Sequence, residues 1–139
     1  MMLRYFTIIA TLLLLTACPK GDAPDATLIL RNNTMDKVIL YRSRITNFTD
    51  TLLPESSWFP TQGTIDLRSI QPESSEEIPD QWGRVMEANT GKVLMVFFFD
   101  RDTILHYSWE EVRADYKVLR RYDLSLSDLE AMDWTVEYP

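Results

Sequence analysis

VLMVFFF, the sequence of residues 93–99, is continuously apolar and rich in β-branched and aromatic side chains. Gly91 precedes this run and the triplet DRD at residues 100–102 follows it, so the run has clear ends. A short run of this composition favours a β-strand over a helix. Since it has no polar face, we expect a central strand that is buried on both sides.

The segments before this run are predicted to be mainly strands and loops. Residues 26–31 and 37–42 are β-rich, and the NNTMD segment between them has turn-forming side chains, so they predict a hairpin. Residues 51–53 predict a short edge strand, and residues 64–67 alternate apolar and polar side chains as a strand does. Residues 71–80 are acidic and bounded by prolines, which predicts a loop.

The segments after the run are predicted to contain further strands. The DRD triplet at residues 100–102 indicates a tight turn, after which residues 103–107 return as a hairpin partner. Residues 134–138 alternate apolar or aromatic with polar side chains, which predicts a final strand.

Two short helices are predicted between these strands. Ser108 and Glu111 fit a capping box, and the helix that they begin is expected to end near Asp115. Ser127 with Glu130 fits a second box. Strands before helices, without βαβ alternation, predict a mainly β (α+β) fold. We expect an antiparallel sheet or sandwich with two short helices near the C-terminus.

The N-terminal residues have the pattern of an export signal. Arg4 is followed by an apolar run at residues 5–15, which is shorter than the roughly twenty residues that span a bilayer. Ala17 precedes Cys18, the single cysteine of the chain. Residues 1–17 therefore predict a cleaved signal peptide, and the segment resembles the lipobox of a bacterial lipoprotein. That resemblance implies lipid attachment at Cys18; an ordinary signal peptide beside a fortuitous cysteine is the alternative.

The expected mature chain has a tether and one domain. Residues 18–25 comprise the lipidated cysteine and a polar, proline-broken tether, and residues 26–139 form a single β-rich domain. Two or more acyl chains would hold the protein stably on a lipid bilayer. In the sorting pattern of many Gram-negative lipoproteins, Asp after the cysteine retains the protein at the inner membrane. Pro19 stands there, so the outer membrane is the expected location, on either its periplasmic or its surface face.

Composition argues against several classes of function. The whole chain has a net charge of −7, and loss of Arg4 with the signal peptide makes it more acidic still. An acidic surface repels phosphate backbones, so we expect no nucleic-acid partner. With Cys18 consumed by lipid, no thiol is left for a disulfide, a zinc site or a cysteine nucleophile.

Neither cofactor nor metal is expected. Asp100 and Asp102 have a spacing that calcium loops also use, but a calcium ion needs about six to eight oxygen ligands and Arg101 opposes a cation. Glu73, Glu76 and Glu77 carry suitable charge, but a solvated loop explains them equally well.

His106, the only histidine, is the candidate for catalysis. With Asp100 and Asp102 nearby in sequence it suggests a small periplasmic or surface hydrolase. However, the chain has no G-x-S-x-G motif, and a lone histidine in a strand is more often structural.

Aromatic residues are the candidates for ligand binding. Trp109 and Tyr116 fit the apolar stripe of a helix and are assigned to the core. Trp58, Phe59 and Trp82 stand in loop-like sequence, and we expect these three to face a ligand if any aromatic does. Thr51 and Thr103 each fit the Asp-Thr-aliphatic pattern that some Gram-negative anaerobes O-glycosylate, although turn or strand-entry roles explain them equally well.

The C-terminal third carries a resemblance. It reads WEEVR from Trp109, YKVLRRYDLSLSDL from Tyr116 and WTVEYP from Trp134. With the RNN segment that begins at Arg31, it is similar to a group of small, uncharacterised lipoproteins of gut-type Gram-negative anaerobes. The resemblance implies lipidation, an envelope location and one β-rich domain, and it implies no activity.

These observations predict a non-enzymatic envelope lipoprotein. Its domain is expected to act as a binding or assembly module for an envelope protein or a glycan. The alternative is the hydrolase centred on His106. An enzyme requires that histidine in a concave pocket within hydrogen-bond reach of carboxylates or hydroxyls, whereas a binding module requires an exposed apolar or aromatic patch of roughly several hundred Å².

Overall fold

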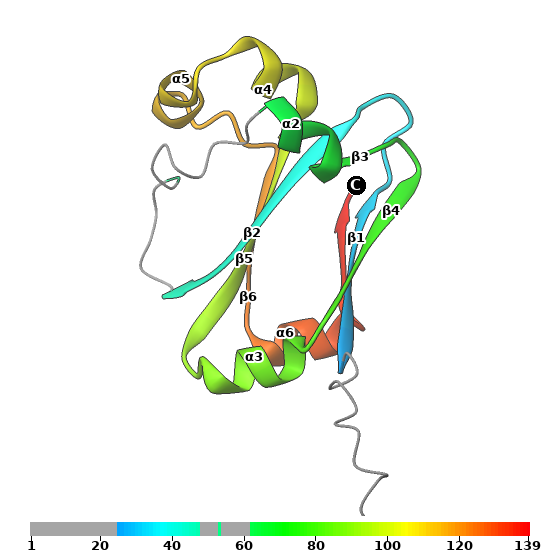
Figure 1. Cartoon of the computed structure of the whole chain (residues 1–139), viewed down its shortest axis with the longest axis vertical. Coiled ribbons are helices and arrows are strands. Elements are labelled where there is room, and N and C mark those ends of the chain that lie inside the picture. Colours follow the sequence, from blue (N-terminus) through cyan, green and yellow to red (C-terminus); the bar gives the residue numbers. More distant parts are fainter. Residues whose placement is uncertain (1–24, 48–52, 54–61) are drawn as a thin grey trace, which may run out of the picture.

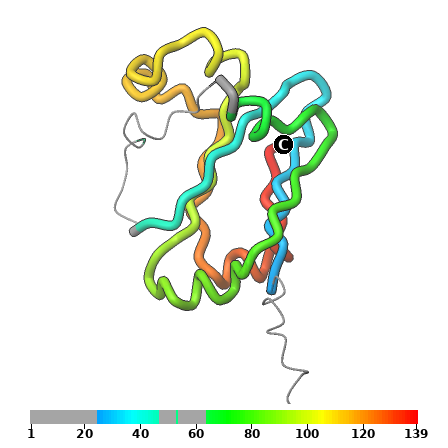
Figure 2. Tube along the Cα trace, in the orientation of Figure 1, coloured from blue at the N-terminus to red at the C-terminus, as the bar shows by residue number. Residues whose placement is uncertain are grey.

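The computed structural model describes residues 25–47, 53 and 62–139, and shows two β-sheets that pack against each other with helices at both ends (Figure 1). The path of the chain can be followed in Figure 2. In chain order the described elements are β1 (Ala26–Asn32), β2 (Ile39–Asn47), α2 (Gln62–Ile65), η3 (Asp66–Arg68), β3 (Ser69–Ile70), β4 (Ser74–Asp80), α3 (Trp82–Ala88), β5 (Lys92–Asp100), α4 (Arg101–His106), α5 (Trp109–Ala114), β6 (Arg120–Leu124), α6 (Leu126–Ala131) and β7 (Thr135–Tyr138).

The apolar run at residues 93–99 forms β5, and it is buried on both faces as predicted. β5 lies between β2 and β6 in a sheet of strand order β3-β2-β5-β6. Leu94, Val96 and Phe98 point toward the second sheet and pack with Leu28 and Val136 from its strands. The core between the two sheets is therefore built on alternate residues of one strand.

The remaining side chains of β5, on the opposite face of the strand, pack in a second apolar cluster on the outside of the same sheet. Phe97 and Phe99 stack with their ring centroids 6.1 Å apart, and Phe99 also meets the edge of Trp109 from α5. Ile65 of α2 and Ile104 of α4 complete the cover. These short helices explain why the strand needs no polar face.

The second sheet has the strand order β4-β1-β7. β1 pairs with β4 in antiparallel orientation and with β7 in parallel orientation. The fold class is confirmed as mainly β with short helices, although the strand pairing is mixed rather than purely antiparallel.

The two C-terminal helices and the final strand are also confirmed, with one change. Ser108 and Glu111 form the capping box of α5. The box of α6 uses Ser125 and Asp128, not Ser127 and Glu130 as predicted. Ser125 has the extended backbone of a cap, with ψ of 170°, whereas Ser127 is already inside the helix.

The predicted hairpin between residues 26–31 and 37–42 is wrong, although both strands exist. β1 and β2 belong to different sheets, so the chain crosses between sheets after Asn32. The side chain of Asn32 is fully buried at this crossover. Its Nδ2 donates to the carbonyl oxygens of Lys37 (2.7 Å), Ile70 (3.1 Å) and Gln71 (3.1 Å). One buried amide thus joins β1 to the segments on both sides of β2.

Two further strand predictions are replaced by helices. Residues 103–107 were expected to form a strand, but Arg101–His106 is helix α4, because the Asp100 carboxylate accepts the backbone N–H of Asp102 at 2.9 Å and caps a helix. Residues 64–67 lie in α2 and η3, where Ile65 is buried as the pattern required. The alternation was thus correct for Ile65 but wrong for Leu67, which is 75% exposed, and the local hydrogen bonding is that of a helix.

The predicted acidic loop at residues 71–80 is also wrong, because most of it is strand β4. Its partner is β1, with Ile78 opposite Leu28. The acidic residues and Pro79 lie on an edge strand, where they discourage pairing with another chain. Of the predicted strand at residues 51–53, only Leu53 falls within the described residues, and it is buried.

Replacing Glu73 with asparagine is expected to raise the free energy of unfolding by about 0.5–1 kcal/mol. Glu73 is exposed in the turn before β4 and has φ of 52°, a conformation that asparagine tolerates better than glutamate. Urea denaturation measures the change. Glu77→Asn, at an exposed position within β4, serves as the control. A gain in both variants would show that loss of negative charge, and not backbone strain, is responsible.

Candidate functional site

Trp82 is the one predicted ligand-facing aromatic residue that the structure describes. It is the first residue of helix α3 rather than part of a loop, and its side chain is half-buried. The indole Nε1–H donates to the carbonyl oxygen of Ile78 at 2.9 Å, and the ring packs against the core between the sheets. The indole is therefore held in a fixed position before any ligand arrives.

Trp82 lines a groove of about 430 Å³ on one side of the sandwich. The groove lies between β2, β4, η3 and the start of α3, and Figure 1 shows β2 and β4 diverging toward the end that carries α3. We call it the Trp82 groove. Its lining residues are Tyr41, Ser43, Thr64, Leu67, Arg68, Ile78, Asp80 and Trp82.

The short length of β3 explains why this side of the sandwich is open. β3 has two residues and pairs only with Ile39 and Leu40 of β2. Beyond them, Tyr41 and Ser43 lie on β2 where β3 no longer covers the strand. The groove is therefore a consequence of sheet topology.

Arg68 and Asp80 supply opposite charges from different walls of the groove. The guanidinium carbon of Arg68 lies 5.7 Å from the centroid of the Tyr41 ring, within range of a cation–π contact. Burial raises the pKa of the Tyr41 phenol, and the positive charge of Arg68 partly opposes this rise. Asp80 is exposed at the end of β4, and its carboxylate accepts the backbone N–H of Gln81 at 2.7 Å.

The chemistry of the Trp82 groove is that of a polar binding site with an aromatic wall. The indole of Trp82 and the apolar side chain of Leu67, 75% exposed, offer surfaces for the apolar face of a ligand. Arg68 donates hydrogen bonds, Asp80 accepts them, and the Ser43 hydroxyl can do both. This combination suits a ligand that carries both C–H faces and many hydroxyl groups.

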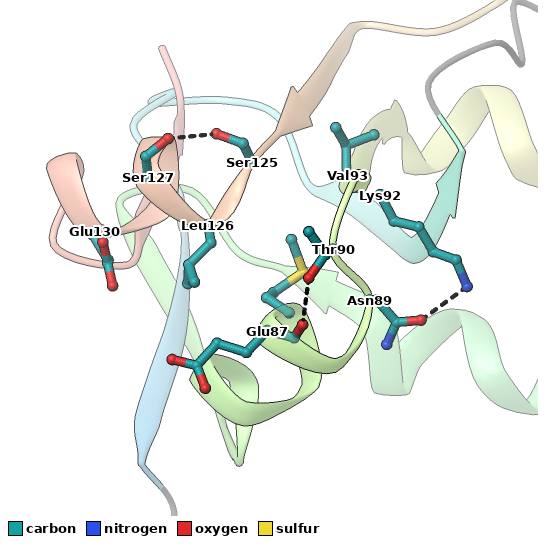
Figure 3. Close-up of a pocket in the computed structure, with 11 residues that line it drawn as sticks. Glu87, Asn89, Thr90, Lys92, Val93, Ser125, Leu126, Ser127 and Glu130 are labelled. Carbon is teal, nitrogen blue, oxygen red and sulfur yellow. Dashed lines mark hydrogen bonds between the residues drawn. The ribbon is translucent and has the colours of Figure 1, made fainter.

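A second hollow, of about 670 Å³, lies at the end of the molecule between α3 and α6 (Figure 3). Met86, Val93 and Leu126 give it an apolar lining, and Glu87 and Glu130 lie on one side. We call it the α3–α6 hollow.

Several polar groups of the α3–α6 hollow bond to one another. The Ser125 and Ser127 hydroxyl oxygens are 2.9 Å apart, and Lys92 donates to the side-chain oxygen of Asn89 at 2.8 Å. The hydroxyl of Thr90 donates to the carbonyl oxygen of Glu87.

The structure does not assemble the predicted His106 group into a catalytic arrangement. His106 is exposed at the end of α4, and its Nδ1 lies 2.7 Å from the backbone carbonyl oxygen of Asp102. Because a carbonyl oxygen only accepts, this nitrogen carries the proton. The Asp100 carboxylate is engaged as the cap of the same helix. The three residues therefore have local roles in α4.

The remaining predicted sites divide into described and undescribed residues. Thr103 is partly buried inside helix α4. Cys18, Thr51, Trp58 and Phe59 lie outside the described residues. Within the described ranges, no group of three or more His, Cys, Asp or Glu side chains gathers as metal ligands would. The helices in those ranges are also all too short or too polar to cross a bilayer.

Comparison with known proteins adds no identity. No known protein family, curated protein or solved structure matches the chain.

Of the residues that line the Trp82 groove, only Trp82 was predicted from its chemistry. Arg68 was not considered, and Asp80 was assigned to an acidic loop. Their convergence depends on β4 pairing with β1 and on β3 being two residues long. A tryptophan close to prolines and charged residues was the only local signal for this site.

Proposed function

We propose that this chain is a lipid-anchored envelope protein whose domain is a non-enzymatic module that binds glycans in the Trp82 groove. The observation that carries the proposal is that Trp82, Arg68 and Asp80 line one open groove. Pyranose rings present C–H groups on one face and hydroxyls at the rim. An indole stacks on the C–H face, and charged side chains form hydrogen bonds with the hydroxyl groups.

The fixed position of Trp82 supports binding rather than catalysis. The indole is held by the carbonyl oxygen of Ile78 and by core packing, so little side-chain entropy is lost when a ligand stacks on it. Among the described residues that line the groove there is no histidine or cysteine. The arrangement of His106 gives no support to the hydrolase alternative.

The entry point of the chain is consistent with a lipid anchor at Cys18. The Asp25 carboxylate accepts the backbone N–H groups of Gly83 (3.0 Å) and Arg84 (2.9 Å) of α3. A tether over residues 19–25 spans at most about 25 Å when fully extended. The anchor would thus keep the α3 and α6 end toward the bilayer, with α4 and α5 at the opposite end (Figure 1).

Trp82→Leu is expected to weaken glycan binding about tenfold, because the loss of a stacked aromatic face removes roughly 1–3 kcal/mol. Leucine keeps apolar bulk against the core, so the fold is expected to persist. Isothermal titration calorimetry on the mature protein in detergent micelles, which keep it in solution with or without an acyl group, measures the affinity. The probes are cellobiose, cellobiouronic acid, chitobiose and the disaccharide of N-acetylglucosamine and N-acetylmuramic acid.

Tyr107→Leu is the matched control, since Tyr107 is an exposed aromatic residue between α4 and α5 and is not among the residues that line the groove. It is expected to bind each probe as the unchanged protein does. Failure of all four disaccharides to bind the unchanged protein would refute glycan binding. Equal losses in the two variants would show that Trp82 does not contact the ligand.

A further inference from the structure

We infer that the Trp82 groove selects a saccharide that carries a carboxylate, with the carboxylate bound by Arg68 and a sugar ring stacked on Trp82. This inference rests on the glycan-binding function proposed above and adds the class of sugar. A uronic-acid polysaccharide and a muramic-acid glycan would both present this chemistry.

The position of Arg68 is the first reason. Arg68 is half-buried at the end of η3, and its guanidinium is placed beside the Tyr41 ring. Within the part of the chain that the structure describes, it forms no ion pair with a carboxylate. Arginine forms two parallel hydrogen bonds with a carboxylate, and a fixed guanidinium in a groove is suited to that geometry.

Asp80 fixes the direction in which an acidic sugar would bind. Its carboxylate is on the β4 wall, whereas Arg68 is on η3. A ligand carboxylate at the Asp80 end would be repelled, while sugar hydroxyls there would donate to Asp80. The two charges thus favour one orientation, with the acid group at Arg68 and the hydroxyls at Asp80.

The test compares acidic and neutral sugars of the same size. Cellobiose and cellobiouronic acid form one pair, and chitobiose with the N-acetylglucosaminyl-muramic acid disaccharide forms the other. In at least one pair, the acidic member is expected to bind about tenfold more tightly, since hydrogen bonds to charged groups have this strength. The preferred pair identifies the source of the acid. The preference is expected to decrease as salt is raised.

Arg68→Gln is expected to remove the preference for acid and to leave binding of the neutral sugar unchanged. Arg68→Lys keeps the charge without the planar fork, so part of the preference should remain. Arg31→Gln, on the other sheet, is the control for loss of one positive charge. Thermal denaturation of each variant checks that the fold is intact.

The outcomes separate the two proposals. Equal binding of acidic and neutral sugars, or an Arg68→Gln variant that loses both equally, overturns the inference about acidic sugars and leaves glycan binding standing. Binding of none of the four sugars overturns the function on which the inference rests. Selective loss of the acidic sugar in Arg68→Gln, with retention in Arg31→Gln, supports both.

Discussion

Asn32→Asp is expected to lower the free energy of unfolding by about 3 kcal/mol or more at neutral pH. The two side chains have the same shape, so no cavity is made. The Nδ2 of Asn32 donates to three backbone carbonyl oxygens, at distances of 2.7–3.1 Å. A carboxylate has no proton to donate, and its negative charge would face those same oxygens in a fully buried site.

The loss of unfolding free energy in Asn32→Asp should depend on pH, because it arises from the charge of the buried carboxylate. Burial and the three carbonyl oxygens would raise the pKa of the introduced carboxyl in the folded protein. The charge-dependent cost is therefore fully present above that raised pKa, and it is lost as the pH falls to about 4, the value for an unfolded chain. Urea denaturation at several pH values follows the difference between the two proteins.

Asn33→Asp is the matched control, since Asn33 is the exposed next residue and its Nδ2 donates to the Glu137 carboxylate at 3.3 Å. We expect a cost of less than about 1 kcal/mol there. A similar cost at both positions would mean that the buried amide does not hold the crossover between the sheets.

The two asparagines also show what sequence could and could not predict. The sequence NNTMD was expected to form a turn, because Asn and Asp favour turn geometry, and the chain does leave β1 there, although Asn32 is still the last residue of that strand. That turn connects two sheets rather than two paired strands, and which asparagine is buried depends on Ile70 and Gln71, nearly forty residues further along. The sequence around Asn32 does not indicate that these distant residues are its hydrogen-bond partners.

The strand β5 was predictable because its own apolar sequence indicates a buried strand, without knowledge of the residues that cover it. A strand that is apolar at both parities must be covered on both faces, whatever covers it. The apolar residues after it were less informative. Ile104 and Leu105 serve equally well on a short helix that covers the sheet, and Asp100, which was assigned to a turn, caps that helix.

The Trp82 groove was predictable only in part, for a related reason. An aromatic residue in a loop-like segment can be suspected of binding from sequence alone. Its partners Arg68 and Tyr41 come from η3 and β2, and they meet Trp82 only because β3 is short. Binding sites that form at the open side of a sandwich depend on strand lengths, which propensity determines poorly.

Cys18→Ala is expected to release the processed protein from the membrane fraction by a factor of more than about one hundred. Each buried methylene of an acyl chain contributes roughly 0.8 kcal/mol, and a second chain converts marginal binding into stable anchoring. Fractionation of cell envelopes with intact-mass spectrometry measures both the partition and the acyl mass. Precursor that retains residues 1–17 is distinguished by its mass and is excluded from the ratio.

Lys20→Ala, two residues further along the expected tether, is the control and should keep both the acyl mass and the membrane location. An unchanged protein without acyl mass, or an alanine variant that stays in the membrane after cleavage, would contradict anchoring at Cys18. The glycan experiments do not depend on this result, because Trp82 and Arg68 lie in the folded domain. If acylation is found, the bonds from Asp25 to α3 place that domain within about 25 Å of the bilayer surface. An envelope glycan bound by the Trp82 groove would then be held close to the membrane that carries the anchor.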